Sequence, residues 1–448
     1  MSHKTAWMLV AILVVVVFGA VACGATPAPQ VIKETVVVEK EVEVEVEKEV
    51  EVVVTATPEP VAEADTILIG GFGPLSAPGS YQAGTEMRQA TEMAVDEINE
   101  AGGVLGKEVE LIFGDTEGLP ERGTAVTERL ITQNRVVGLV GEYHSGVGQA
   151  SMEVAHRYGV PVIFAETWGN EITASGYPEV FRVAPTTDYA GEFMANYVAE
   201  VDWKSIVFIM EDTDYGRSQA EAYVEQLEAR GVTDVEIIYA DPATEDYTPI
   251  LQRIQQDPPD LLGGVITGIG TSRIVRQACE LGLAPTAETA MLTTVDAQYP
   301  EYWENAGDCG NYTFFSFYGL PASLWNEKTE AFMQNFEERY GHVPGAPALE
   351  IYDATFLIAE AIKEAGTTEP QALIAALENI RYTGAMGDYW FEYTSANPVP
   401  PDKPAWMWHQ WLTPNVFMLQ YTEAGQPADD ANVVFPVERA TGPLYTSP

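Results

Sequence analysis

The sequence predicts an α/β protein built from parallel β-sheets and divided into two lobes. From residue 66 onward, short apolar segments with strand character alternate with segments of helical pattern. Alternation with helical patterns of about 10–15 residues indicates strand–helix–strand units with right-handed crossovers. The stretch from 66 to 448 is also too long for one compact core, which favours two lobes.

The expected elements follow one another along this stretch. In the first helix, Met87, Ala90, Ala94 and Ile98 recur at helical spacing, and the pattern stops before Gly102. Predicted helices span 85–99, 122–133, 147–158, 216–230 and 272–281. Predicted strands span 66–72, 109–113, 136–140, 160–164, 205–210, 235–239, 261–266 and 289–293.

The loops that follow the strands are the expected place for a ligand. In parallel α/β sheets the binding crevice lies beyond the carboxyl ends of the strands, where helix N-termini also point. These loops combine glycine, hydroxyl, aromatic and acidic residues, a composition that suits a small polar ligand. They span 73–81, 141–146, 165–170, 211–216, 267–270 and 294–296.

The N-terminus has the pattern of a lipoprotein signal peptide. An apolar run from Ala6 to Ala22 follows Lys4, and small residues precede Cys23, the position at which bacterial lipoproteins are acylated. We therefore expect residues 1–22 to be cleaved and Cys23 to anchor the protein by lipid at the outer face of the cytoplasmic membrane. The alternative is an uncleaved transmembrane anchor, although the run is near the lower length limit of about 17 residues.

Residues 23–65 are expected to form a low-complexity, lipid-anchored spacer. Residues 31–54 alternate valine with charged residues, and prolines flank them on both sides. A period of two does not give a helix with one apolar face, and an isolated strand has no partner to pair with. The alternative is self-association through the valine faces, which the dense glutamates oppose by charge repulsion.

Charge and cysteine content limit the classes of partner. The formal net charge is −44, so we expect no nucleic-acid partner. If Cys23 carries lipid, Cys279 and Cys309 are left as a pair, which would form a disulfide in an oxidising compartment. Neither these cysteines nor the five scattered histidines have metal-ligand spacing, so no metal and no cofactor is expected.

Eight segments between residues 66 and 435 match one known family, in the family's order. Through them the chain resembles the type I periplasmic substrate-binding proteins of ABC importers, in particular the branched-chain amino-acid and amide-binding group, whose type member is leucine-binding protein. The segments are GPLSAPGSYQAG (73–84), MAVDEINEAGGVLGKEVEL (93–111), LVGEYHSGVGQA (139–150), GVPVI (159–163), GYPEVFRVAPTTDYAG (176–191), EDTDYGRSQAEAY (211–223), VRQACELGL (275–283) and EIYDATFLIAEAIKEAG (350–366).

The resemblance implies two Rossmann-like lobes joined by three crossing strands, near 183–188, 315–319 and 418–422. It implies a monomeric binding protein, not an enzyme, that closes about a hinge on a small ligand and delivers it to the permease of an ABC importer. The expected ligand is a branched-chain or other amino acid. Lobe one would comprise residues 66–187 and 317–419, and lobe two residues 188–316 and 420–448, the latter with the C-terminal tail.

The resemblance also indicates two charged contacts to the ligand. Ser145 matches a serine at a helix N-terminus that holds the ligand carboxylate, a position where exposed N–H groups and the helix dipole favour an anion. The acidic partner of the ligand ammonium falls near Thr294 to Asp296, and on chemical grounds we choose Asp296. Tyr81 and Tyr215 match pocket tyrosines that come from the two lobes.

Trp168 departs from the pattern of the family. Glu166 and Trp168 fall where the family uses a backbone carbonyl and a threonine to bind the amino-acid head of the ligand. A tryptophan cannot accept a hydrogen bond from an ammonium as threonine can. Either a cation–π contact replaces that bond, or the ligand is not an ordinary α-amino acid.

Two other function classes are alternatives to binding and import. Ser145 lacks the glycine two residues before it that a nucleophile elbow needs, and the glycines at 268–270 lack the third glycine of a dinucleotide loop. These absences argue against an enzyme. A sensor for amides, urea or related small molecules, acting through a separate signalling partner, stays an alternative because the same fold serves sensors.

One segment, 397–415, has no counterpart in the family. It is rich in proline and contains Trp406, Trp408 and Trp411. The alternation of its side chains predicts an edge strand that packs on a lobe. An aromatic surface that contacts the transporter is the other interpretation.

Overall fold

The computed structural model describes residues 66–320 and 324–448. The predicted signal peptide, Cys23 and the spacer lie outside these residues. Within them, no helix combines the length and the apolar character that a membrane crossing requires.

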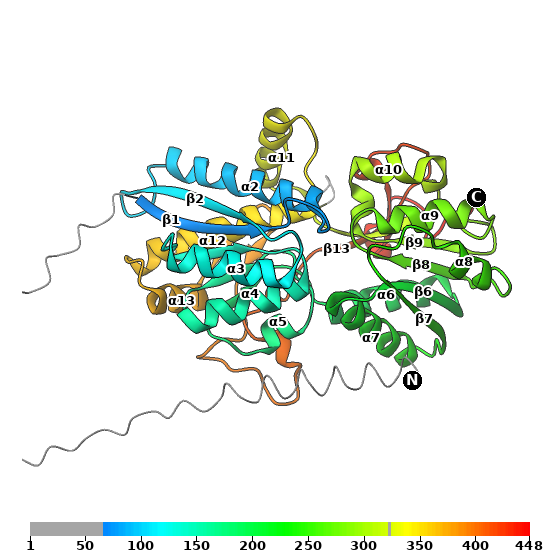
Figure 1. Cartoon of the computed structure of the whole chain (residues 1–448), viewed down its shortest axis with the longest axis horizontal. Coiled ribbons are helices and arrows are strands. Elements are labelled where there is room, and N and C mark those ends of the chain that lie inside the picture. The colour runs from blue at the N-terminus through cyan, green and yellow to red at the C-terminus, as the bar shows by residue number, and fades with distance from the viewer. Residues whose placement is uncertain (1–65, 321–323) are drawn as a thin grey trace, which may run out of the picture. The chain divides into compact units, whose positions relative to one another are not determined.

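The first sheet has five parallel strands in the order β2-β1-β3-β4-β5. Figure 1 shows two of them, β1 and β2, side by side. One face packs against α2 (Tyr81–Glu100), α11 (Glu327–Tyr340), α12 (Ala346–Ala365) and α13 (Pro370–Asn379). The other face packs against α3 (Pro120–Thr132) and α4 (Ser145–Tyr158), with α5 (Glu171–Ala174) beside them. The strands are β1 (Thr66–Gly73), β2 (Glu108–Asp115), β3 (Gly138–Gly141), β4 (Val162–Phe164) and β5 (Val180–Arg182).

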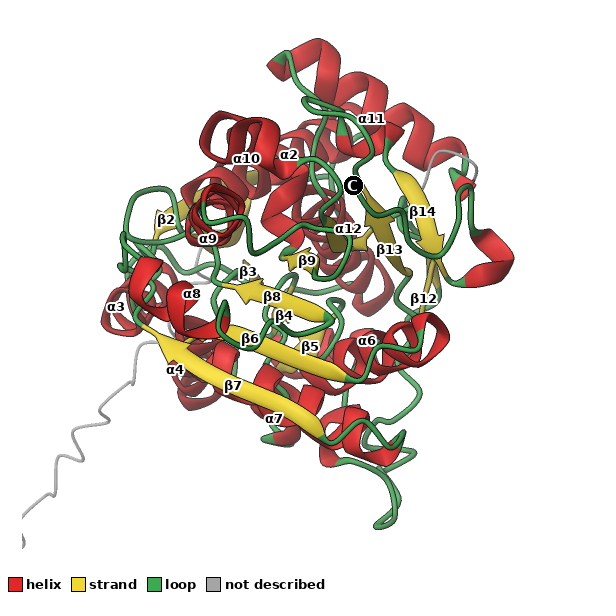
Figure 2. Cartoon of the chain, turned by 90° about the vertical axis from the view of Figure 1, so that its right-hand side faces the viewer, coloured by secondary structure: helices red, strands yellow, loops and turns green. Residues whose placement is uncertain are grey.

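The second sheet has seven strands in the order β14-β13-β10-β9-β8-β6-β7 (Figure 2). Five neighbouring strands, β10, β9, β8, β6 and β7, run parallel to one another. By contrast, β13 and β14 are antiparallel to their neighbours. Helices α6 (Thr187–Val201) and α7 (Asp214–Ala229) pack on one face. Helices α8 (Thr248–Ile254), α9 (Gly270–Glu280) and α10 (Pro300–Ala306) pack on the other. The strands are β6 (Ser205–Glu211), β7 (Asp234–Ala240), β8 (Leu261–Val265), β9 (Ala290–Thr293), β10 (Phe314–Tyr318), β13 (Val416–Gln420) and β14 (Asn432–Phe435).

The helices begin and end where their sequences allow it. The predicted apolar stripe of α2, including Met87, Ala90 and Ala94, is buried and shares a core with α12. The Thr186 hydroxyl caps α6 by accepting a hydrogen bond from the Tyr189 N–H, and Thr213 caps α7 in the same way. These caps stabilise the first turns of α6 and α7, which lie beside the loops that follow the strands.

The predicted α/β fold with parallel sheets is confirmed, and each strand and helix predicted between residues 66 and 293 corresponds to an observed element. Several helices begin earlier than predicted, because their first turns lie in glycine-containing segments that the periodicity did not include. Helix α2, for example, begins at Tyr81, four residues before the predicted start. β10 and β13, which lie beside two of the predicted crossings, are members of the second sheet. The residue bounds of the two lobes stay a prediction.

The predicted edge strand within 397–415 is wrong. A 3₁₀ turn, η4 (Ala405–Met407), and isolated bridges of Trp408 and Gln410 take its place. His409 has a φ of 48°, in the left-handed region, which interrupts an extended backbone. The segment therefore does not form the regular ladder of backbone hydrogen bonds that an edge strand would have.

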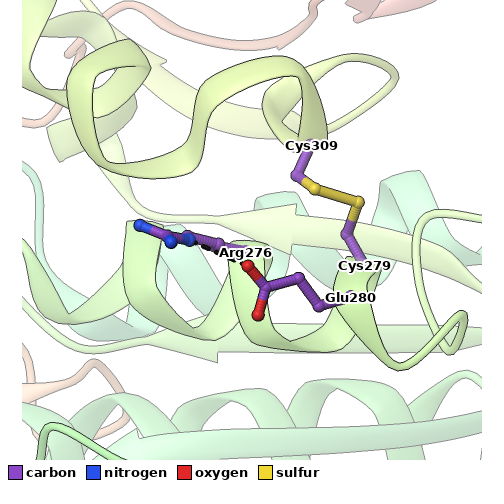
Figure 3. The surroundings of a disulfide bond; sticks show 4 residues. All are labelled: Arg276, Cys279, Glu280 and Cys309. Carbon is purple, nitrogen blue, oxygen red and sulfur yellow. Dashed lines mark hydrogen bonds and ion pairs between the residues drawn. A yellow bond between two sulfur atoms is a disulfide. The ribbon is translucent and has the colours of Figure 1, made fainter.

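A disulfide joins Cys279, near the end of α9, to Cys309 in the 3₁₀ turn η2 (Gly307–Gly310) (Figure 3). The S–S distance is 2.09 Å and the Cα atoms are 5.7 Å apart. On the same helix, Arg276 and Glu280 form an ion pair of 3.0 Å. The bond closes a loop with a sequence separation of 30 residues, which contains β9 and α10.

Candidate ligand-binding site

A pocket lies at the carboxyl ends of strands from both sheets. Loops after β3 and β4 contribute one side, and loops after β8 and β9, with the first turn of α7, contribute the other. The remaining cavity volume is only about 20 Å³, so the side chains leave room for about one water molecule. The lining residues are Tyr143, His144, Ser145, Glu166, Trp168, Tyr215, Thr267, Thr294, Val295 and Asp296.

The pocket gathers five of the six residues that the sequence indicated as ligand contacts. The sixth, Tyr81, is 45% exposed and lines a separate groove with Glu86 and His342. Tyr81 begins α2, and it is the preceding residue, Ser80, whose side chain reaches the pocket acid Asp296. The five residues that the pocket brings together are Ser145, Glu166, Trp168, Tyr215 and Asp296.

Asp296 connects loops of the two sheets. Its Oδ1 accepts hydrogen bonds from the hydroxyls of Ser80 (3.2 Å) and Tyr143 (3.3 Å), which belong to loops of the first sheet. Its Oδ2 accepts hydrogen bonds from the N–H of Gly268 (3.0 Å) and the hydroxyl of Thr294 (3.1 Å), which belong to loops of the second. Burial raises the pKa of Asp296 to about 6, although the hydrogen bonds from Gly268, Thr294 and Ser80 oppose the rise.

The N-terminus of α4 faces the same pocket. Ser145 is its first residue, and the Ser145 Oγ accepts a hydrogen bond from the N–H of Gly169 (3.0 Å). The Nε2 of His144 accepts a hydrogen bond from the N–H of Ser80 (3.1 Å), and burial lowers the pKa of His144 to about 4, so the ring is neutral near pH 7. The first N–H groups of a helix have no carbonyl partner within the helix. This end of the pocket therefore offers N–H donors, with the carboxylate of Asp214 close to Gly146 in the first turn of α4.

Aromatic rings form another wall. The Trp168 ring lies edge-to-face with Tyr215, at a centroid distance of 6.0 Å, and with Tyr318, at 4.1 Å. The hydroxyl of Tyr318 has no hydrogen-bond partner among the described residues. The wall is therefore mainly aromatic.

Two buried carboxyl groups stand beside this wall. Glu166 lines the pocket and is 3% exposed, and Glu350, within α12, is 0% exposed. Burial raises the pKa of both groups; the negative charge of Glu166 further raises the pKa of Glu350, whereas hydrogen bonds with Glu350 and with the Trp168 side chain lower that of Glu166. Among the described residues, no N–H or hydroxyl group donates to either oxygen of Glu350 or to the Oε2 of Glu166.

Arg182 holds the loop that carries Glu166 and Trp168. Its guanidinium donates to the carbonyl oxygens of Thr167 (3.1 Å) and Gly169 (2.6 Å), and also to the side chain of Gln410 (2.5 Å). Burial lowers the pKa of Arg182 to about 9, so the group stays charged near pH 7. Gln410 belongs to the segment 397–415, so this segment helps, through Arg182, to hold the loop that carries Glu166 and Trp168.

The sequence did not single out several of these residues. Tyr143, His144 and Thr267 lie in loops that were expected to line the crevice, and the neighbouring Ser145 was the signal for the first two. Glu350 could have been found as an acid within an otherwise apolar stretch of helix. Arg182 had no comparable signal, because its partners lie far away in the sequence.

Ser145 is not arranged as a nucleophile. Its Oγ accepts from a backbone N–H, while His144 uses its ring nitrogen for Ser80. Within residues 66–320 and 324–448, no group of three or more His, Cys, Asp or Glu side chains is placed to hold a metal ion.

Comparisons with known proteins agree with the geometry. A family model described as "Periplasmic binding protein" matches residues 66–400. The Leu/Ile/Val-binding protein homolog 3 of Brucella melitensis is 25% identical over 313 residues, covering 69% of this chain and 82% of that protein.

Two solved structures share the fold. The branched-chain amino acid transporter substrate-binding protein LivJ of Streptococcus pneumoniae, in complex with isoleucine, has a TM-score of 0.71 and 21% identity, covering 86% of this chain and 100% of that chain. A solute-binding protein of Rhodopseudomonas palustris in complex with benzoate has a TM-score of 0.69 and 19% identity, covering 86% and 97% of the two chains. At these sequence identities, the structural similarity shows a shared fold and nothing more.

Proposed function

Because the chain belongs to the periplasmic binding protein family, we propose that it captures a small zwitterionic ligand of the amino-acid type outside the cytoplasm and delivers it to an ABC importer. A solute-binding role for an ABC transporter follows from its relatives. The observation that carries the finer proposal is the pairing, in one pocket, of the α4 N-terminus with the carboxylate of Asp296.

The two ends of the pocket suit the two charges of an amino acid. The N–H groups of α4, beside Ser145, favour the α-carboxylate through hydrogen bonds and the helix dipole. Asp296 favours the ammonium, because a buried carboxylate is stabilised most by an opposite charge. The relatives named for leucine, isoleucine and valine support this class of ligand.

Closure of the two lobes would trap the ligand. The Asp296 hydrogen bonds to Ser80 and Tyr143 join loops of the two sheets, and opening the pocket would break them. In this proposal the closed state is stabilised by ligand that bridges α4 and Asp296, as in other hinged binding proteins. The predicted lipid on Cys23 would hold the protein near the permease.

A ligand screen followed by scattering tests the proposal. A bound amino acid at 100 times its dissociation constant should stabilise the fold by about 2.7 kcal/mol, which a thermal-shift assay detects. Small-angle scattering with and without that ligand should show a smaller radius of gyration in its presence. No stabilisation by any amino acid, together with unchanged scattering, would contradict the proposal.

A further inference from the structure

We propose that the ligand carries two positively charged nitrogens, one at Asp296 and the second at the Glu166–Glu350 pair. The inference rests on the proposed function and deepens it, because it names the class of ligand as a dibasic amino acid.

The charged side chains that line the pocket are acidic. Glu166 and Asp296 both line it, and no lysine or arginine is among the lining residues. The buried Arg182 donates to the carbonyl oxygens behind the loop instead, and His144 is held neutral by burial. A ligand with one ammonium would neutralise Asp296 and leave Glu166 without an opposite charge.

The Glu166–Glu350 pair lacks the partners that buried acids normally have. Buried polar atoms in native proteins are nearly always hydrogen-bonded, and an unpartnered one calls for an explanation. Here Oε2 of Glu166 and both oxygens of Glu350 receive no hydrogen bond from an N–H or hydroxyl donor of the described residues. By contrast, the buried Asp353 of the same helix accepts bonds from the N–H groups of Ala385 and Met386 and from the Tyr389 hydroxyl. A cationic nitrogen at Glu166 would supply the missing donors.

The aromatic wall favours the same charge. Trp168 lies in the pocket beside Glu166, and Tyr215 and Tyr318 pack against it. Aromatic faces attract cations, and Trp does so most strongly. The replacement of a hydrogen-bonding threonine by Trp168 is therefore explained if a cation lies against this ring.

Anionic and neutral ligands fit the pocket less well. A benzoate would add a negative charge to a pocket that already holds two acids and no cationic side chain, and like charges oppose binding. Leucine would pair its ammonium with Asp296 but would set an aliphatic side chain against Glu166. The second cationic nitrogen distinguishes the proposed ligand class from both.

Calorimetry with lysine and norleucine tests the proposal, because the two amino acids differ chiefly in the terminal ammonium. Lysine should bind the wild-type protein at least about tenfold more tightly than norleucine, since a buried charge pair gains a partner. Cadaverine, which is lysine without its carboxylate, measures how much the carboxylate contributes to binding, and benzoate serves as the anionic probe.

Two variants assign the effect to the carboxyl pair. Glu166→Gln and, separately, Glu350→Gln should remove most of the preference for lysine over norleucine. Glu86→Gln is the matched control, because Glu86 is also a buried glutamate but lies outside this pocket; it should leave the preference within about twofold. Thermal melting of each variant establishes that it is folded.

The outcomes are distinct. Tight binding of norleucine or leucine with weaker binding of lysine and cadaverine would overturn this inference and leave the proposed function intact. An unchanged lysine preference in both folded glutamine variants would also overturn it. If no amino acid and no diamine binds the folded wild-type protein, both this inference and the proposed function fail.

Discussion

The indole nitrogen of Trp406 donates a hydrogen bond of 2.6 Å to Oδ2 of Asp188, in the first turn of α6. The carbonyl of Trp406 in turn accepts a hydrogen bond of 2.6 Å from the Thr173 hydroxyl, in α5. The segment 397–415 thus ties a helix beside the first sheet to a helix of the second, next to the place where the chain passes from β5 to α6.

Removing this tie should destabilise the fold. Trp406→Phe should lower the free energy of unfolding by about 1–3 kcal/mol, because a hydrogen bond to a charged group is lost, as measured by denaturant unfolding. Trp408→Phe is the matched control, since its indole bonds only to the carbonyl of Tyr177, and its effect should be smaller. Equal stability of Trp406→Phe and the wild type, with impaired transport, would favour the aromatic surface as a transporter contact instead.

Substitutions at the two ends of the pocket should weaken ligand binding by different amounts. Asp296→Asn should weaken binding of a zwitterionic ligand by about 2–5 kcal/mol, because the ligand ammonium would be buried without an opposite charge. Ser145→Ala should weaken it less, since the backbone N–H groups of α4 remain. Calorimetry on the best ligand of the screen gives both values, and a loss below about threefold for Asp296→Asn would mean that another acid binds the ammonium.

Stability should rise as the pH falls from about 8 to about 6.5, below which the lowered pKa of His144 acts in the opposite direction. Burial raises the pKa of Glu86 to about 8 and that of Glu142 to about 7, from an ordinary value of 4.5 for each. These two carboxyl groups therefore hold more protons in the folded state than in the unfolded chain between about pH 4.5 and 8, and their contribution to stability falls as pH rises through that window. Melting temperatures at pH 6.5 and 8 test this.

The control for the pH dependence is Glu86→Gln. Repulsion among the many surface acids acts in the same direction, so the wild-type trend alone does not identify the buried groups. The variant should show a smaller difference between its melting temperatures at pH 6.5 and 8, because it lacks one of the titrating groups. An equal difference would show that Glu86 does not cause the trend.

The anchor proposed from the sequence has its own test. Cys23→Ser should release the protein into the medium, or leave the signal uncleaved, because the acyl chain would be the attachment. Fractionation of cells that express each form measures the outcome. A variant that is cleaved and still bound to the membrane would show that Cys23 is not the anchor.

Local pattern was enough to predict most of the fold and much of the site. The strands and helices follow from hydrophobic period, and the pocket loops follow from the rule that ligands bind beyond the carboxyl ends of parallel strands. Ser145 was assigned from its match to the family, and Asp296 from the family position and its chemistry; each lies in such a loop.

The residues that were missed depend on contacts between distant parts of the chain. Glu350 comes to Glu166 only because α12 packs against the first sheet, and Arg182 reaches Gln410 from more than two hundred residues away. Tyr81 was assigned to the pocket because it matches a pocket tyrosine of the family, but it is 45% exposed at the start of α2, and the contact to Asp296 comes from Ser80. A match in sequence position does not determine which side chain at a helix start reaches the site.

The disulfide encloses a part of the pocket. The loop between Cys279 and Cys309 contains Thr294, Val295 and Asp296, so a covalent ring of protein carries the acid that we assign to the ligand ammonium. Protein made in a reducing cytosol would lack this ring, and its Asp296 segment would be held by packing and hydrogen bonds alone. Recombinant material for ligand screening should therefore be exported or oxidised, and assayed for free thiols, before a failure to bind is interpreted.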